Sequence, residues 1–221
     1  GGLNCFDRKT GKFTAYKHNP NNLNSIGSNQ VRVVNKDRFG NIWVGVNEGG
    51  GLDKFDKATE IFHHIDFIDR DIMCIENDRN GDMWIGTYYG GFGVMNAETY
   101  EYKVFCNNPS DTMSLSNNIV WALYEDTISN IMYVGTRGGG LNMFNASTKE
   151  FLGYEMKNQH EGGLTSNNIL SILRDKSGVL WIGSETDGLN KYNTHRKKFS
   201  ILHTSVDFKS LVSSNNVMAF W

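Results

Sequence analysis

The sequence predicts an all-β protein, a β-propeller of four-stranded antiparallel blades. Three observations lead to this prediction. The chain of 221 residues has 24 glycines and only 2 prolines, which suits many tight turns between strands. One sequence pattern recurs with the spacing, about 40–50 residues, that is typical of propeller blades. Within each repeat, short apolar stretches alternate with turn residues.

The most regular part of the repeat joins a turn to an aromatic residue. Asp-x-x-Gly is followed by Trp-Ile-Gly or a close variant, and the third copy lacks the Asp and has Tyr for Trp. The copies occupy residues 37–45, 78–86, 129–135 and 175–183, and their aromatic residues lie 41, 49 and 48 positions apart. We interpret this part as a hairpin whose Gly supplies the positive φ that the turn needs. The aromatic side chain should fill the space between adjacent blades.

A second motif, Gly-Leu-Asn-x-aromatic or a variant of it, followed by Asp or Asn, comes after each of the four hairpins, and a fifth copy opens the chain. The copies begin at Gly2, Gly51, Gly91, Gly140 and Gly188, and the copy at Gly91 has Met95 in place of the aromatic residue. Another aromatic residue follows at a fixed interval, and these are Phe13, Phe62, Tyr102, Phe151 and Phe199. Each unit therefore reads as four strands, named A to D in chain order.

A third motif, Ser-Asn-Asn or Ser-Asn-Gln before a β-branched residue, precedes strand A. It occupies residues 28–31, 116–119, 166–169 and 214–217, and residues 69–72 replace it with Asp-Arg-Asp-Ile. We expect these side chains to cap the backbone where the chain passes to the next blade.

These motifs divide residues 1–221 into a propeller fragment. We predict a partial blade at 1–20, four blades at about 25–65, 66–106, 114–156 and 164–203, and the start of another blade at 211–221. A ring closed by joining the two ends would lack a strand B. We therefore expect the chain to be a truncated part of a longer protein.

The combination Ser166-Asn-Asn-Ile, Asp175-x-x-Gly-x-Leu-Trp-Ile-Gly and Gly188-Leu-Asn-x-Tyr resembles the two-component regulator propeller repeat. The resemblance is clearest in residues 164–193 and extends over essentially the whole chain. It implies the ligand-sensing part of a hybrid two-component receptor, located in the periplasm and anchored in the inner membrane. Implied neighbours are further blades, a C-terminal β-sandwich domain and a histidine kinase, and a homodimer stays open. An oligosaccharide is the ligand that the resemblance favours.

Two other functions are weighed against sensing. One is a propeller enzyme, either a glycosidase or a lyase, which would need paired carboxylates or a histidine in the central face. The histidines lie instead in or near predicted D strands, where we expect them at the surface: His18, His63, His64, His160, His195 and His203. The other is a structural or protein-interaction scaffold. We assign no catalytic residue and expect no enzyme activity in this segment.

No cofactor and no metal is expected, because the chain has no His or Cys spacing that suits a metal. Cys5, Cys74 and Cys106 form no disulfide pattern, and we expect them to be small apolar strand residues. The net charge of −2 gives no basic field for nucleic acid.

Candidate ligand-binding residues are those that differ between copies on one face of the blades. The B–C and D–A connections share that face, and a mixture of aromatic, acidic and amide groups there suits a sugar. The candidates are Glu48, Arg70, Tyr88, Tyr89, Arg137, Glu185 and Asp187. Asn47 stands beside Glu48 in the same kind of loop.

Overall fold

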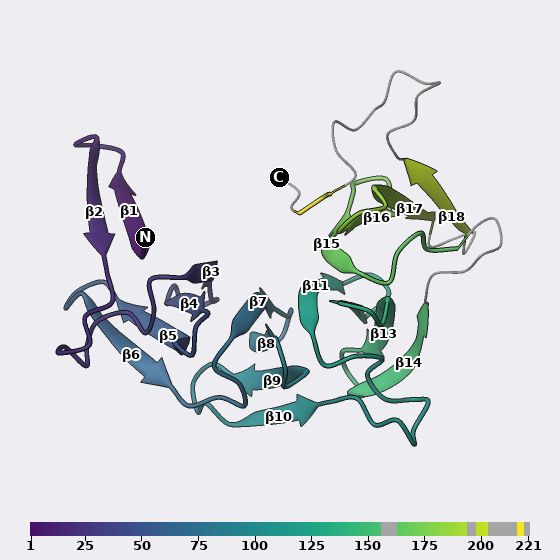
Figure 1. Ribbon diagram of the computed structural model, residues 1–221, viewed down its shortest axis with the longest axis horizontal. Coiled ribbons are helices and arrows are strands. Elements are labelled where there is room, and N and C mark those ends of the chain that lie inside the picture. The colour runs from purple at the N-terminus through teal and green to yellow at the C-terminus, as the bar shows by residue number, and fades with distance from the viewer. Residues whose placement is uncertain (156–162, 194–197, 203–215, 219–221) are drawn as a thin grey trace. The chain divides into compact units, whose positions relative to one another are not determined.

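The computed structural model describes residues 1–155, 163–193, 198–202 and 216–218. All regular structure in these residues is β, and no helix occurs in them, which confirms the predicted all-β class. The chain forms two compact units, Gly1–Val104 and Phe105–Trp221, which are described separately. Figure 1 shows the strands of both units along the chain.

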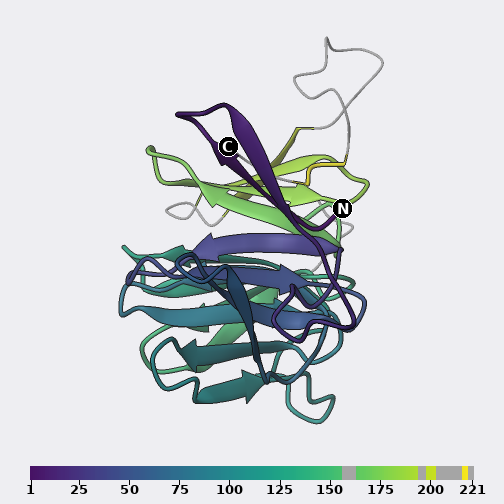
Figure 2. The ribbon, with the colours of Figure 1, turned by 90° about the vertical axis from the view of Figure 1, so that its left-hand side faces the viewer.

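The first unit contains a two-stranded hairpin and two four-stranded sheets. The hairpin joins β1 (Leu3–Asp7) to β2 (Lys12–Tyr16). The first blade has the strand order β3 (Val31–Lys36), β4 (Ile42–Val46), β5 (Gly51–Asp56) and β6 (Ile61–Ile65). The second blade has the order β7 (Ile72–Asn77), β8 (Asp82–Thr87), β9 (Phe92–Asn96) and β10 (Tyr102–Phe105). Figure 2 shows the blue strands of this unit from the side, next to one another.

The second unit contains two more sheets with the same up-and-down order. The third blade consists of β11 (Val120–Asp126), β12 (Ile131–Thr136), β13 (Leu141–Asn145) and β14 (Glu150–Glu155). The fourth consists of β15 (Ile169–Arg174), β16 (Val179–Ser184), β17 (Leu189–Asn193) and β18 (Lys198–Leu202). In both units, the first strand of one blade packs against the first strand of the next, β3 against β7 and β11 against β15.

The A–B turns are held by a carboxylate that also bonds the aromatic residue of strand B. Asp37 accepts the backbone N–H of Asn41 and the indole N–H of Trp43, at 2.9 and 2.8 Å. The indoles of Trp84 and Trp181 donate to Asp78 and Asp175 in the same way, at 3.1 and 2.8 Å. The turn and the inter-blade side chain are therefore one hydrogen-bonded unit, which explains the constant spacing of six residues between Asp and Trp.

The third blade replaces this arrangement. Asp126 caps its own turn by accepting the N–H of Ile128 and the hydroxyl of Ser129, and it lies 3.6 Å from Arg174. Tyr133 takes the place of Trp and is buried with Leu180 of the fourth blade. The altered motif therefore keeps its packing role while losing the Asp–Trp bond.

Blade contact also explains the Gly that follows the aromatic residue in strand B. A Cβ on Gly45 would meet Ile72 of the next blade's first strand within 2.5 Å, and one on Gly135 would meet Ile169 within 2.6 Å. Trp43 is fully buried in the cluster that contains Ile72, as predicted for an inter-blade side chain. Trp181 is only half-buried within the described residues.

The third motif is shifted by one residue in the third blade. The first buried residue of strand A is Ile169 in the fourth blade and pairs with Ser184, but in the third blade it is Val120, which pairs with Thr136. Strand A of the third blade therefore begins one residue later, relative to this motif, than strand A of the fourth blade. The reason is that Asn117 and Ser166 make the same cap, each accepting the N–H two residues later, at 2.9 and 3.2 Å.

Candidate functional site

The first residue of every B–C loop is fixed by the backbone in the same way. Its N–H donates to the carbonyl that lies just before strand A of the same blade. These four bonds are Asn47 to Gln30, Tyr88 to Asp71, Arg137 to Ile119 and Glu185 to Asn168, all between 2.9 and 3.1 Å. Amide, phenol, guanidinium and carboxylate groups therefore stand at one equivalent position on a rigid backbone frame.

In the first unit, residues 69–71 join the B–C loops of both blades. The Arg70 carbonyl accepts the N–H of Gly51 at 2.8 Å. The Asp69 carboxylate accepts hydrogen bonds from the backbone N–H groups of Tyr89 and Gly90, at 2.7 and 3.1 Å. The Asp71 carboxylate accepts one from the backbone N–H of Gly49, at 3.1 Å. The replacement of Ser-Asn-Asn by Asp-Arg-Asp thus keeps the capping role and adds charge to this face.

The predicted residues of the first unit lie at this junction. Tyr89 is 67% exposed and its ring lies 4.6 Å from the Tyr88 ring, at 72°. The Glu48 carboxylate accepts the Gln30 amide at 2.5 Å, and Glu48 has a φ of 58°. Arg70 lines a cavity of about 240 Å³ together with His64, Phe67 and Asp69. The structure therefore gathers Glu48, Arg70, Tyr88 and Tyr89 around the same set of loops.

The second unit repeats the arrangement with other side chains. The Arg137 guanidinium lies over the Trp121 ring at 5.0 Å. Asn168 donates its side-chain amide to the Glu185 carboxylate at 2.8 Å, and its backbone bridges to Arg137. The N–H of Asp187 donates to the Ser184 hydroxyl at 3.0 Å. Arg137 and Glu185 thus flank Asn168.

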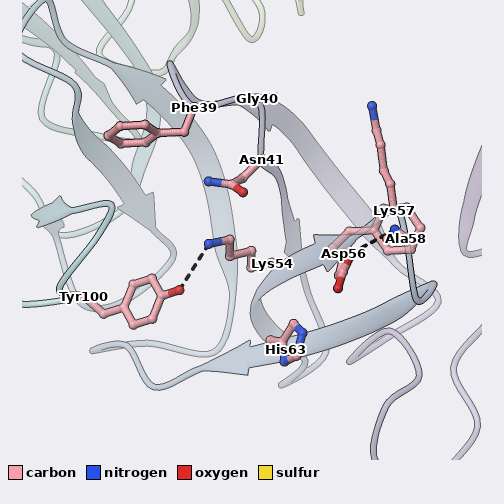
Figure 3. A pocket seen from close by; sticks show the side chains of 10 residues that line it. Phe39, Gly40, Asn41, Lys54, Asp56, Lys57, Ala58, His63 and Tyr100 are labelled. Carbon is pink, nitrogen blue, oxygen red and sulfur yellow. Dashed lines mark hydrogen bonds between the residues drawn. The ribbon is translucent and has the colours of Figure 1, made fainter.

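A larger pocket lies on the opposite face of the first unit, where no candidate had been placed. Its volume is about 590 Å³, and it opens among the A–B turn, the C–D turn and strands of the first blade, with Tyr100 of the second blade as its far wall (Figure 3). Phe39, Asn41, Lys54, Asp56, Lys57 and His63 are among the residues that line it. Two residues in the sequence could have identified this pocket. Lys54 lies in strand C, seven residues after Asn47, and His63 lies in strand D, and both occupy positions that vary between copies.

The two adjacent histidines of β6 differ in their surroundings. His63 is exposed, as expected. The side chain of His64 is 45% exposed, yet its Nδ1 lies 2.6 Å from a carboxylate oxygen of the fully buried Asp53, and its Nε2 lies 2.9 Å from the Leu23 carbonyl. His64 therefore lies at the surface, as expected, and in addition ties the D–A connection to the blade.

In the part of the chain that the structure describes, neither the cysteines nor a cluster of metal-binding side chains forms a further site. Cys5, Cys74 and Cys106 form no disulfide; burial raises the pKa of Cys74 to about 12, which suits an inert strand residue. Cys5 and Cys106 are exposed, so the expectation of apolar strand residues fits Cys74 alone. Among the described residues, no three His, Cys, Asp or Glu side chains are grouped to hold a metal. No helix in that part of the chain is long and apolar enough to cross a membrane.

Comparison with known proteins identifies the repeat. Residues 66–89 and 163–186 match the model of the two-component regulator propeller family, so these two segments are copies of that family's repeat. One match falls on the blade with Asp69-Arg70-Asp71, the copy that departs most from the pattern. A search of the curated proteins finds no match.

Solved structures confirm the propeller fold. The extracellular domain assigned to a hybrid two-component system of B. thetaiotaomicron superposes with a TM-score of 0.76 at 23% identity, over 97% of this chain and 27% of that chain. The extracellular domain assigned to a one-component system of the same organism has a TM-score of 0.63 at 18% identity, over 91% of this chain and 34% of that chain. Virginiamycin B lyase from Staphylococcus aureus has a TM-score of 0.62 at 14% identity, over 93% of this chain and 63% of that chain. The chain thus spans about a third or less of the two sensor domains.

Proposed function

We propose that this chain is a ligand-sensing segment of an extracytoplasmic receptor in a two-component system, and that its ligand is an oligosaccharide. The observation that carries the sensing role is the pair of two-component regulator propeller repeats in a chain with the fold of such extracellular domains. In this proposal the segment lies in the periplasm, beside further blades, a β-sandwich domain and the membrane anchor of the same protein. A homodimer is compatible with it.

The loop face supports a sugar ligand through its chemistry. A fixed backbone frame presents Tyr88 and Tyr89, whose rings can stack on the C–H surfaces of a pyranose. Arg70 and Glu48 on the same loops can exchange hydrogen bonds with hydroxyls. Because the frame is the same in every blade, exchanging these side chains alters the ligand without altering the fold.

Calorimetry against a panel of oligosaccharides tests this proposal, with the complete protein that carries this chain. We expect binding without turnover, and we expect Tyr88→Ala/Tyr89→Ala to weaken it at least about tenfold. Lys9→Ala on the exposed β1–β2 turn is the control and should change nothing. Unaltered affinity in the double variant would remove the second blade's part of the loop face from the site.

An enzyme is the second candidate, because a lyase shares the fold. His64 beside buried Asp53 resembles the pairing that activates a general base. Its Nε2, however, lies against the Leu23 carbonyl, so this nitrogen is occupied in the structure. Analysis of the calorimetry samples for cleaved products separates the candidates, since any product that disappears with His64→Ala would favour the lyase.

A further inference from the structure

Lys54 and His63 form a basic pair on the wall of the larger pocket. They are direct register partners on β5 and β6, so their side chains project from the same side of the sheet. The equivalent pairs in other blades are Met143 with Gly153 and Lys191 with Ser200. Two basic groups in this position repel each other when both are charged. The Asp56 carboxylate offsets part of this repulsion at His63, and a bound anion would relieve the rest.

The Lys54 ammonium is held in place without being neutralised. It lies 5.7 Å from the Trp43 ring and 5.6 Å from the Tyr100 ring, and it is 3.3 Å from the Tyr100 hydroxyl. Trp43 is itself fully buried and bonded to Asp37. No carboxylate of the described residues pairs with Lys54, which therefore keeps donors for a ligand.

The remaining lining suits a sugar ring better than a simple anion. Phe39 and Tyr100 are 49% and 38% exposed, so both offer ring surface to the pocket. Asp56 is an ionised acceptor, because the hydrogen bond from the Ala58 N–H, followed by that from Thr59, lowers its pKa. Figure 3 shows Lys54, Asn41 and Asp56 around the same space, while Lys57 extends away from it. A volume of about 590 Å³ lies within the usual range for small-ligand sites.

We propose that this inter-blade pocket is a second ligand site, which binds a hexuronic acid unit of an oligosaccharide. Lys54 and His63 hold the sugar carboxylate, Phe39 and Tyr100 cover its ring faces, and Asp56 and Asn41 accept its hydroxyl protons. The proposal rests on the proposed oligosaccharide function, but it uses the face opposite the Tyr88 and Tyr89 loops.

The experiment compares three probes by calorimetry on the complete protein: hexuronic acid trisaccharides, their neutral hexose counterparts, and acetate. Lys54→Met keeps the aliphatic stem over Trp43 and removes the charge. Lys191→Met is the matched control, because Lys191 lies over Trp181 at 5.5 Å on the equivalent position of β17. We expect Lys54→Met to weaken uronate binding at least tenfold, His63→Gln to weaken it less, and Lys191→Met to leave it unchanged. Added salt should weaken binding to the wild type.

Each outcome decides the proposal. Equal affinity for acidic and neutral trisaccharides, equal effects of Lys54→Met and Lys191→Met, or acetate binding as tightly as the uronate would each overturn it. Neutral sugar binding that depends on Tyr88 and Tyr89, without any uronate preference, overturns this proposal and leaves the proposed function intact. Uronate binding that depends on Lys54 alone supports the pocket and removes the loop site. Thermal melting of each variant confirms that it is folded.

Discussion

Asp53 occupies a position of strand C where the third and fourth blades have asparagine. Asn142 and Asn190 accept the N–H groups of Ser116 and Thr165 at 2.9 and 3.1 Å. Asp53 accepts the N–H of Gly27 at 2.8 Å in the same way, but as an acid with no exposed surface. Burial raises the pKa of Asp53, and the bonds from Gly27 and His64 only partly oppose this.

The raised pKa sets the direction of the pH effect at this residue. A carboxyl group that binds its proton more tightly in the folded state favours folding most at a pH below its unfolded pKa, about 3.9. That contribution is lost as the pH rises through the folded pKa. The contribution of Asp53 to the stability of the folded state is therefore smallest near neutral pH, where its charge is buried.

We predict that Asp53→Asn leaves the stability at pH 7 equal or higher, because asparagine can accept from Gly27 and donate to His64 without a charge. Asp53→Ala should lose about 1–3 kcal/mol, because the Gly27 N–H is left buried without its acceptor. Urea unfolding of both variants at pH 7 measures the difference. A loss in Asp53→Asn as large as that in Asp53→Ala would show that the charged pair itself stabilises the blade.

At the scale of the elements, contact between consecutive blades depends on the Gly of strand B. Gly45 is not in a strained backbone conformation, so its role is spatial: its missing Cβ leaves room for Ile72 and Val33. Gly135 makes the same room for Ile169, and Gly183 for Val217. Within each unit, the first strand of the following blade thus passes directly over this glycine, at Gly45 and at Gly135.

We predict that Gly45→Ala destabilises the protein by about 1–3 kcal/mol, through overpacking against Ile72. In Gly45→Ala/Ile72→Ala, the smaller side chain at position 72 should accommodate the new methyl group, so the double variant should lose less than the sum of the single losses. Denaturant unfolding of the four proteins gives the coupling energy. Additive losses would mean that the two blades do not meet at this glycine.

Much of the element structure was predictable because the same turn chemistry recurs in each blade. Gly40, Gly81 and Gly178 have the positive φ expected of the A–B hairpin. The shift of the third blade at Val120 was not predictable, because Asn117 and Ser166 cap the backbone equally well and the sequence does not say which residue does so. The inter-blade pocket was missed because it needs Tyr100 from one blade beside Lys54 of another.

At the scale of the whole molecule, the repeat predicted the fold class. The candidate ligand face was predicted differently, by separating the residues that recur in every blade from the loop residues that differ between blades. The same backbone hydrogen bond, to the carbonyl before strand A, holds the first residue of each B–C loop, and the sequence does not reveal it. These residues are Asn47, Tyr88, Arg137 and Glu185. The choice of Tyr88, Arg137 and Glu185 as candidates therefore rests on their variability, and the structure places them at one position of the blade. Which of them meet a common ligand stays a prediction.

The aspartates that cap turns have lowered pKa values, whereas the pKa of Asp53 is raised. Hydrogen bonds from Ser177 and Trp181 hold the pKa of Asp175 well below its usual range. The bond from Thr10 lowers that of Asp7. For Asp37, burial alone would raise the pKa, but the bonds from Trp43 and the turn outweigh it, and the pKa is lowered.

We predict that the protein loses stability as the pH falls from about 5 towards 2. The turn aspartates Asp7, Asp37, Asp56 and Asp175 all have lowered pKa values, so each favours folding above its unfolded pKa of about 3.9 and loses that effect as it is protonated. Asp53 acts in the other direction, but it is a single group against four. Urea midpoints at pH 7, 5, 4 and 3 test this, and Asp175→Asn should show a shallower decline between pH 5 and 3. A midpoint that rises as the pH falls would mean that burial of Asp53, rather than turn capping, governs the acid response of the molecule.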